Sequence, residues 1–332
     1  MRAKRSRFVR RSLWVSLTLL LIAIGGLVWM AWSLVSPPRR NLQDYHRQRL
    51  EHPGEHGIRI QSFSAAMGSI PALLVEPRPN GSPGKRGKVL RRQLEERGRS
   101  LPAHGTITGT LVLLHGRNGR KEDMLPVAER FCAAGFRCLL PDLPAHGESP
   151  IKKTRFGQAP FEAELPAALL EEAGKNFQFT TRPAGLWGIS MGGSFATRAT
   201  ADAPDRWDGL VIVCSFDRLD LVIENQCRRR LGFLGEPAAV FVTSLAHRFG
   251  GPRYETVQPA LWARSVTAPV LVAHGNADPL ISLEQGRRLF DGFAQSRDSR
   301  WVEVDGGDHH DVLITPMPLY SIMADWFLEA FK

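Results

Sequence analysis

The clearest chemical signal is a serine with a glycine two residues away on each side. Gly188, Ser190 and Gly192 form the pattern G-x-S-x-G, directly after an apolar run and before a helical pattern. A serine nucleophile on a sharp strand-to-helix turn needs strained backbone angles, and glycines on both sides leave room for that turn. The following helix would direct its N-terminal dipole at the reacting group. The placement therefore predicts Ser190 as a nucleophile.

A serine nucleophile needs a base, and the base needs an acid that orients it. Asp278 and His309 lie on loops after two later apolar runs of the chain. We predict that Ser190, Asp278 and His309 form a catalytic triad. Asp217, which follows an earlier apolar run, is the alternative acid, and His310 is the alternative base.

The negative charge that develops on the substrate oxygen needs hydrogen-bond donors. The backbone N–H groups of Arg117 and Met191 are the predicted donors, because one follows a Gly-containing bend and the other follows Ser190. His115 and His146 are predicted to support loops rather than to react.

These residues require a parallel sheet whose strand ends meet at one edge. From about residue 58 onward, short apolar runs alternate with helical patterns, which is typical of α/β architecture. The predicted strands are 58–63, 70–75, 110–114, 137–140, 184–189, 210–214, 269–273 and 301–304. Helices are predicted at 122–134, 194–203 and 319–331.

Two segments interrupt the alternation. Residues 77–109 are rich in Lys and Arg and are predicted to be a partly helical, solvated surface insertion. The alternative is a basic patch that lies against anionic lipid or an acidic partner. Residues 217–268 lie between two predicted strands and are predicted to form a lid over the strand ends.

The charge distribution argues against a nucleic-acid partner. The 332-residue chain has a formal net charge of +10, but residues 1–40 hold eight Lys or Arg and no acid. The remaining chain carries 35 basic and 33 acidic residues, so it is close to neutral. The excess charge belongs to the N-terminal end rather than to a DNA-binding face.

The N-terminal region predicts a membrane anchor. Residues 13–35 carry no formal charge, and as a helix they would be about 34 Å long, enough to cross a hydrocarbon core of about 30 Å. A cleaved signal peptide would have a shorter apolar region and a small-x-small site, and a buried helix is the other alternative. Residues 1–12 are predicted to be a basic cytoplasmic tail and 36–57 a linker. The positive-inside bias is slight and favours an extracytoplasmic domain at 58–332.

Neither a disulfide scaffold nor a metal site is predicted. The four cysteines are scattered and lie in apolar surroundings, although the first two could pair in an oxidising compartment. They are Cys132, Cys138, Cys214 and Cys227. Asp308 and Asp311 flank the two histidines, but no third ligand at suitable spacing accompanies them.

Taken together, these motifs resemble the α/β-hydrolase superfamily of serine hydrolases, particularly its membrane-anchored, esterase-like members with a small lid. The resemblance covers residues 58–332 and rests on five loops. These loops hold His115-Gly116, residues 141–149, Ser190, Asp278 and His309. Ala145 stands where the second of these loops usually has a glycine. The resemblance implies an α/β-hydrolase fold with a mostly parallel eight-stranded sheet flanked by helices, and a triad in the chain order Ser, Asp, His.

The predicted reaction is hydrolysis of an ester, thioester or amide through an acyl-enzyme, without a cofactor or metal. The expected substrate is a small-molecule or lipid-like ester. A serine peptidase or acyltransferase would use the same triad, and a catalytically silent binding protein would keep the same fold. Protonation of His309 should lower activity at acid pH.

Overall fold

The computed structural model describes residues 2–65 and 69–332, with side chains from residue 11 onward. The predicted basic tail, residues 1–12, therefore lies almost wholly outside the described side chains. Within the described chain, one helix is long and apolar enough to cross a membrane, at Arg11–Val35. It is part of α1 (Arg2–Val35).

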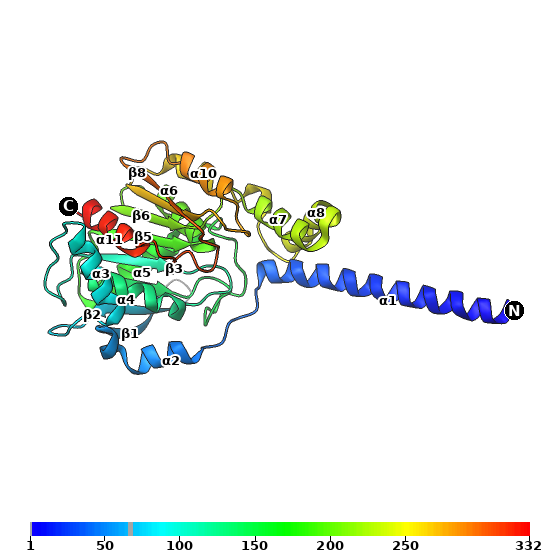
Figure 1. The fold of residues 1–332 in the computed structure, drawn as a ribbon, viewed down its shortest axis with the longest axis horizontal. Helices are drawn as coiled ribbons and strands as arrows, with labels where there is room; N and C mark the ends of the chain where they lie inside the picture. Colours follow the sequence, from blue (N-terminus) through cyan, green and yellow to red (C-terminus); the bar gives the residue numbers. More distant parts are fainter. Residues whose placement is uncertain (1, 66–68) are drawn as a thin grey trace.

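Eight strands form one sheet in the order β1-β2-β4-β3-β5-β6-β7-β8 (Figure 1). The strands are β1 (Ile58–Ala65), β2 (Ile70–Pro77), β3 (Gly109–Leu114), β4 (Phe136–Pro141), β5 (Ala184–Ile189), β6 (Gly209–Val213), β7 (Val270–Gly275) and β8 (Ser299–Val304). β2 is antiparallel to both of its neighbours, β1 and β4. The remaining neighbouring pairs, from β4 through β3 and β5 to β8, are parallel. All eight predicted strands are confirmed, each within two residues at its ends.

The apolar runs of the central strands serve two cores at once. In β3, Leu111 and Leu113 join the cluster on one face of the sheet, while Val112 and Leu114 join the cluster on the other. Successive side chains of a strand point to opposite faces. A strand that is covered on both faces therefore needs an apolar residue at every position.

Helices cover both faces of the sheet. They are α2 (Asp44–Glu51), α3 (Lys85–Glu96), α4 (Leu125–Ala133), α5 (Pro160–Phe177), α6 (Met191–Asp202), α7 (Leu219–Leu231), α8 (Gly235–Arg248), α9 (Pro259–Trp262), α10 (Leu283–Asp291) and α11 (Leu319–Ala330). α3, α4 and α11 contribute to one cluster, and α5, α6 and α10 contribute to the other. The helix predicted at 122–134 begins as a 3-10 turn, Lys121–Met124, and continues as α4 with Pro126 in its first turn.

The two interrupting segments differ in how they sit on the domain. The basic insertion contains α3, whose Leu90 and Leu94 are buried, so its inner face belongs to the core. Arg91 donates hydrogen bonds to the carbonyls of Ala133 and Pro102, and Arg99 pairs with Asp325. The lid segment contains α7 and α8, which pack on each other and project from the body beside α1 (Figure 1).

The chain between α1 and β1 follows the surface of the domain. His46 of α2 is fully buried, and its Nε2 lies 2.8 Å from a carboxylate oxygen of Asp123. Arg39 donates to the carbonyls of Gly147 and Ser149. The predicted linker 36–57 is therefore packed against the domain by specific contacts. All four cysteines are buried, as their apolar surroundings in the sequence predict.

Candidate active site

Ser190 occupies a sharp turn between β5 and α6. Its φ of 53° and ψ of −119° lie in a strained region of backbone conformation. Two hydrogen bonds, each 2.9 Å long, hold the turn: the Ser190 N–H donates to Val213 O, and the Ser215 hydroxyl donates to Ser190 O. α6 begins at Met191, three residues before the start that the sequence predicts, so the serine directly precedes the helix. The hydroxyl therefore lies at the carboxyl edge of the sheet.

The two glycines of the motif are required by close backbone approach. A Cβ at Gly188 would overlap the carbonyl oxygen of Gly192, and a Cβ at Gly192 would overlap the carbonyl oxygen of Leu114. Any side chain at either position would push α6 away from the sheet. The G-x-S-x-G spacing is therefore the spacing at which this turn can close.

The structure brings the three predicted triad residues together. His309 Nε2 lies 3.0 Å from Ser190 Oγ, and His309 Nδ1 lies 2.7 Å from Asp278 Oδ2. Ser190 comes from the turn after β5, Asp278 from the loop after β7 and His309 from the loop after β8. This is the arrangement in which an imidazole takes a hydroxyl proton while a carboxylate fixes its tautomer.

Asp278 is held as a carboxylate. Burial by itself would raise its pKa, but the hydrogen bond and charge of His309 and the N–H groups of Ile281 and Leu280 outweigh burial and lower it. The Leu280 N–H donates to Asp278 Oδ1 at 2.8 Å and the Ile281 N–H donates to the same oxygen at 2.9 Å, which leaves Oδ2 for His309.

The alternative acid and base lie in other environments. Asp217 forms an ion pair with Arg288, 2.5 Å between Oδ2 and Nε. His310 is exposed, and its backbone N–H donates to Asp308.

His115 is fully buried and accepts the Leu143 N–H, and His146 is buried beside it. Burial lowers the pKa of His115 and lowers that of His146 to about 3, so both imidazoles are neutral loop supports.

The two predicted oxyanion donors lie at the serine. An ideal Cβ at Gly116 would stand 3.4 Å from Ser190 Cβ, so the loop that carries Arg117 lies against the nucleophile. Met191 is the first residue of α6, where backbone N–H groups have no intrahelical acceptor. Among the described residues, no acceptor takes a hydrogen bond from the backbone N–H of Arg117 or of Met191. Both amides therefore remain predicted donors to an oxyanion formed at Ser190.

A cavity of about 790 Å³ opens above Ser190 and His309. Its walls combine α7, the loop after β7, Phe156 and the C-terminal end of α1. The apolar side chains of the lid and loop are Leu219, Val222, Ile223, Leu280 and Ile281. Such a cavity suits a ligand with a large apolar part. The sequence did not indicate that α1 reaches this cavity, because an evenly apolar helix has no periodic face that marks a packing side.

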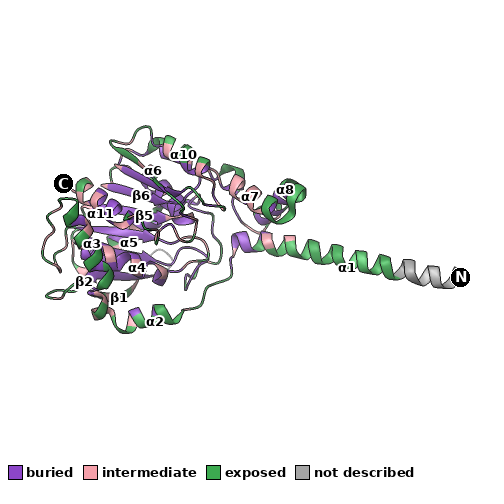
Figure 2. Cartoon of the chain, viewed as in Figure 1, coloured by how far each residue is buried: buried purple, intermediate pink, exposed green. Residues whose placement is uncertain are grey.

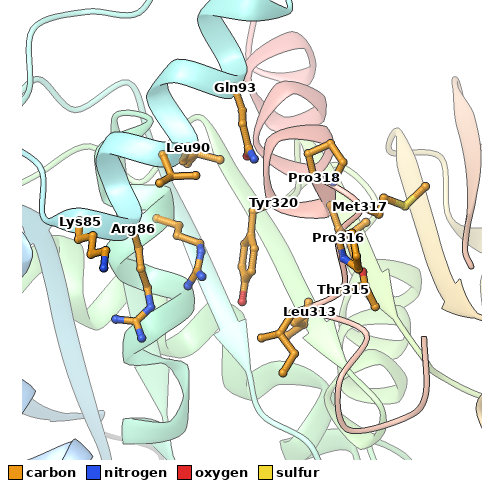
Figure 3. A pocket seen from close by; sticks show the side chains of 14 residues that line it. Lys85, Arg86, Leu90, Gln93, Leu313, Thr315, Pro316, Met317, Pro318 and Tyr320 are labelled. Atoms are coloured by element: carbon orange, nitrogen blue, oxygen red, sulfur yellow. The ribbon is translucent and has the colours of Figure 1, made fainter. Parts of the chain in front are cut away.

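A second cavity, of about 420 Å³, lies between α3 and residues 313–320 (Figure 3). Arg86 of α3 and Tyr320 of α11 both line it, and Arg130 lies over the Tyr320 ring at 4.1 Å. None of the triad residues lines it. The chemistry predicted from the sequence therefore belongs to the first cavity.

Cys214 is a neighbour of the triad that the sequence did not single out. Its thiol and donor atoms of Asp278 and His309 lie within 4.8 Å of one another. Burial raises the pKa of the Cys214 thiol, so it stays protonated and packs as a small apolar group. Two of these three groups are the acid and base described above.

Glu162 organises the loop that carries Phe156 into the cavity. Its carboxyl accepts the N–H groups of Arg155, at 2.7 Å, and Gly157, at 2.8 Å. Burial raises the pKa of Glu162 to about 7. The folded protein therefore holds this proton more tightly than the unfolded chain, whose group has the ordinary pKa of 4.5. The stabilisation of the folded state by protonated Glu162 is fully present below about pH 4.5 and is lost as the pH rises through about 7.

Glu162→Gln should remove this pH dependence. Between pH 4.5 and 8 the wild type should lose up to about 3 kcal/mol more unfolding free energy than the variant, because glutamine keeps the neutral form at every pH. Melting temperatures of both proteins across that range measure the difference. Glu164→Gln, at an exposed position of the same helix, is the matched control. Parallel profiles for the wild type and Glu162→Gln would contradict the expectation.

Comparison with known proteins agrees with this architecture. A family model for the alpha/beta hydrolase fold matches residues 109–243. A search of curated proteins found no match. An esterase of Pyrococcus furiosus is similar in structure, with a TM-score of 0.64 at 17% identity over 91% of this chain and 100% of that chain.

Two further solved structures have the same fold with different named activities. A monoacylglycerol lipase of Paleococcus ferrophilus has a TM-score of 0.50 at 20% identity, over 68% of this chain and 96% of that chain. An acylaminoacyl peptidase of Pyrococcus horikoshii has a TM-score of 0.59 at 15% identity, over 88% of this chain and 44% of that chain. From the sheet order, the turn at Ser190 and these similarities, the chain has the α/β-hydrolase fold.

Proposed function

We propose that this protein is a membrane-anchored serine hydrolase that cleaves a carboxylic ester. The observation that carries the proposal is the position of His309, which is hydrogen-bonded on one side to Ser190 Oγ and on the other to Asp278. Ser190 and His309 both line the cavity, whose walls include aliphatic side chains of α1, α7 and the loop after β7. An imidazole held between a hydroxyl and a buried carboxylate is suited to proton transfer from that hydroxyl.

The proposed reaction proceeds through an acyl-enzyme. His309 takes the proton of Ser190 while Oγ attacks the ester carbonyl, and the N–H groups of Arg117 and Met191 bind the resulting oxyanion. His309 then gives the proton to the departing alcohol. A water molecule, deprotonated by His309, attacks the acyl-enzyme and releases the carboxylic acid, and the proton returns to Ser190. Ester and water are consumed, and acid and alcohol are formed.

The lining of the cavity favours an ester over a peptide. Its walls combine polar side chains with aliphatic ones from α1, α7 and the loop after β7, and the aliphatic part suits an acyl chain better than a peptide backbone with its polar groups. The similar structures include an esterase and a lipase, and also a peptidase. A serine peptidase, a thioesterase or an acyltransferase would use the same triad, so substrate comparison must separate them.

The proposed location is a membrane, with α1 as a retained anchor. The last residues of α1 pack into the domain, and Val35 O accepts the Thr154 N–H at 3.0 Å. Cleavage of α1 would remove these contacts from the folded core, which favours an anchor over a signal peptide. The slight positive-inside bias of the flanking charges favours an extracytoplasmic catalytic domain.

Active-site labelling tests the hydrolase proposal. The full chain in mild detergent should react with a fluorophosphonate probe, and peptide mass spectrometry should find the adduct on Ser190. Labelling should be lost in Ser190→Ala and strongly slowed in His309→Ala. A folded protein that takes no label would contradict the proposal and would favour a binding protein with this fold.

A further inference from the structure

The helix α1 has two parts with opposite environments. Its first part is exposed on every side, as at Leu13 (64% exposed) and Ile22 (66%), whereas Ala31 and Val35 are fully buried in the domain. Figure 2 shows this change at the end of α1 that meets the body. The stretch from Leu13 to Trp29, in which only Leu27 is half-buried, would be about 26 Å long as a helix, close to the thickness of a hydrocarbon core. When that stretch spans a bilayer, the domain must rest directly on the membrane surface.

The end of α1 is also a wall of the cavity above Ser190. Trp29, Met30, Ser33 and Leu34 line it together with residues of α7. Met30 S lies 3.9 Å from the Cys227 thiol of α7, so helix and lid meet at the cavity. The cavity therefore lies at the level where the membrane helix leaves the bilayer.

Specific contacts hold this wall in place. The guanidinium of Arg117 donates to Ser33 O at 2.8 Å and thereby satisfies a carbonyl in the last turn of α1. The Arg117 side chain is half-buried and lines the cavity, while its own backbone N–H is a proposed oxyanion donor. The position of the oxyanion loop and the position of the membrane helix are thus linked through one residue.

The lid continues the membrane-facing surface. α8 packs against α1, and Phe233, Leu234, Val240 and Phe241 project from the lid as exposed apolar side chains. Phe233 is 91% exposed, which is costly for a phenylalanine in water. Exposed basic side chains, Arg228, Arg229 and Arg230, lie at the end of α7 beside this patch. Apolar side chains next to arginines suit a bilayer surface with anionic headgroups.

We propose that the cavity opens to the bilayer beside α1, and that the substrate is a membrane-resident lipid ester whose acyl chain lies against Met30 and Leu34. This inference rests on the proposed hydrolase function and names its substrate class. The ester bond reaches Ser190 when the lipid moves from the bilayer into the cavity. The acyl chain then exchanges one apolar environment for another and crosses no water.

The first test fills the wall of the cavity. Met30→Trp in the full chain, reconstituted in phosphatidylglycerol and phosphatidylethanolamine vesicles, should lower the ratio of kcat/KM for p-nitrophenyl laurate to that for p-nitrophenyl butyrate at least about tenfold. Leu20→Trp, on the exposed part of α1, should keep the wild-type ratio. Fluorophosphonate labelling of Ser190 reports that each variant retains a folded triad.

The outcomes separate the two proposals. If Met30→Trp remains labelled and the laurate-to-butyrate ratio does not change, α1 does not contact the acyl chain and this inference fails while the hydrolase proposal stands. If the wild type neither takes the label nor hydrolyses either ester, the proposed function itself fails.

The second test measures whether the lid enters the bilayer. The four native cysteines are buried, so a cysteine at an exposed position can be labelled selectively. Phe233→Cys carrying an NBD fluorophore should show blue-shifted emission in the same vesicles and quenching by brominated lipids. Glu96→Cys, on the exposed side of α3, should show neither effect. Equal, water-like NBD emission at both positions would overturn the proposal that the cavity opens to the bilayer.

Discussion

Ser190→Ala should lower kcat/KM for ester hydrolysis roughly a millionfold, because the variant has no nucleophile to form the acyl-enzyme. The residual rate should exceed that of the uncatalysed reaction, since the Arg117 and Met191 amides can still bind an oxyanion. Purified full chain and variant, assayed with the same p-nitrophenyl ester, give the ratio directly.

His309→Ala should cost about as much as Ser190→Ala, and the double variant should cost little more, because the two residues act as one unit. His310 is the matched control. It has the same residue type, next in the chain, but its ring is exposed and forms no hydrogen bond with Ser190 among the described contacts. His310→Ala should change kcat/KM less than about tenfold. The opposite order of the two histidine variants would assign the base to His310.

Asp278→Asn should lower kcat about ten-thousandfold while leaving the fold intact. The carboxylate accepts a hydrogen bond from the N–H at His309 Nδ1, which leaves Nε2 without a proton and free to accept a hydrogen bond from Ser190. An amide that presents its NH₂ group to Nδ1 favours the other tautomer, in which Nε2 carries the proton and cannot act as a base. Steady-state kinetics of the ester assay measures the loss.

Asp217→Asn is the control for the acid. Its carboxylate pairs with Arg288 rather than with a histidine. Replacement should therefore lower stability modestly and change kcat less than about tenfold. A large loss of kcat in Asp217→Asn together with a small loss in Asp278→Asn would assign the role of the acid to Asp217, in the loop after β6.

The sequence by itself determined the sheet and the turn at its edge. Strands covered on both faces need continuous apolar runs, so β3, β5, β6 and β7 were visible without coordinates. The turn at Ser190 was equally visible, because Gly188 and Gly192 are the only residue type that the neighbouring carbonyl groups allow. Both are local requirements, and each is met by the type of residue at a given position, so the sequence reveals it.

The sequence predicted Asp278 and His309 but left Asp217 and His310 as alternatives, and the tertiary structure decided which of these residues meet at Ser190. His309 and His310 are adjacent and chemically identical, and only the packing of the loop after β8 brings the first ring to Ser190. The same holds for the choice between the two carboxylates, since Asp278 contacts His309 whereas Asp217 pairs with Arg288. The place of α1 was also invisible, since an evenly apolar helix shows no difference between lipid-facing and protein-facing sides. Such choices depend on contacts between residues far apart in the chain, and no spacing within a single segment records them.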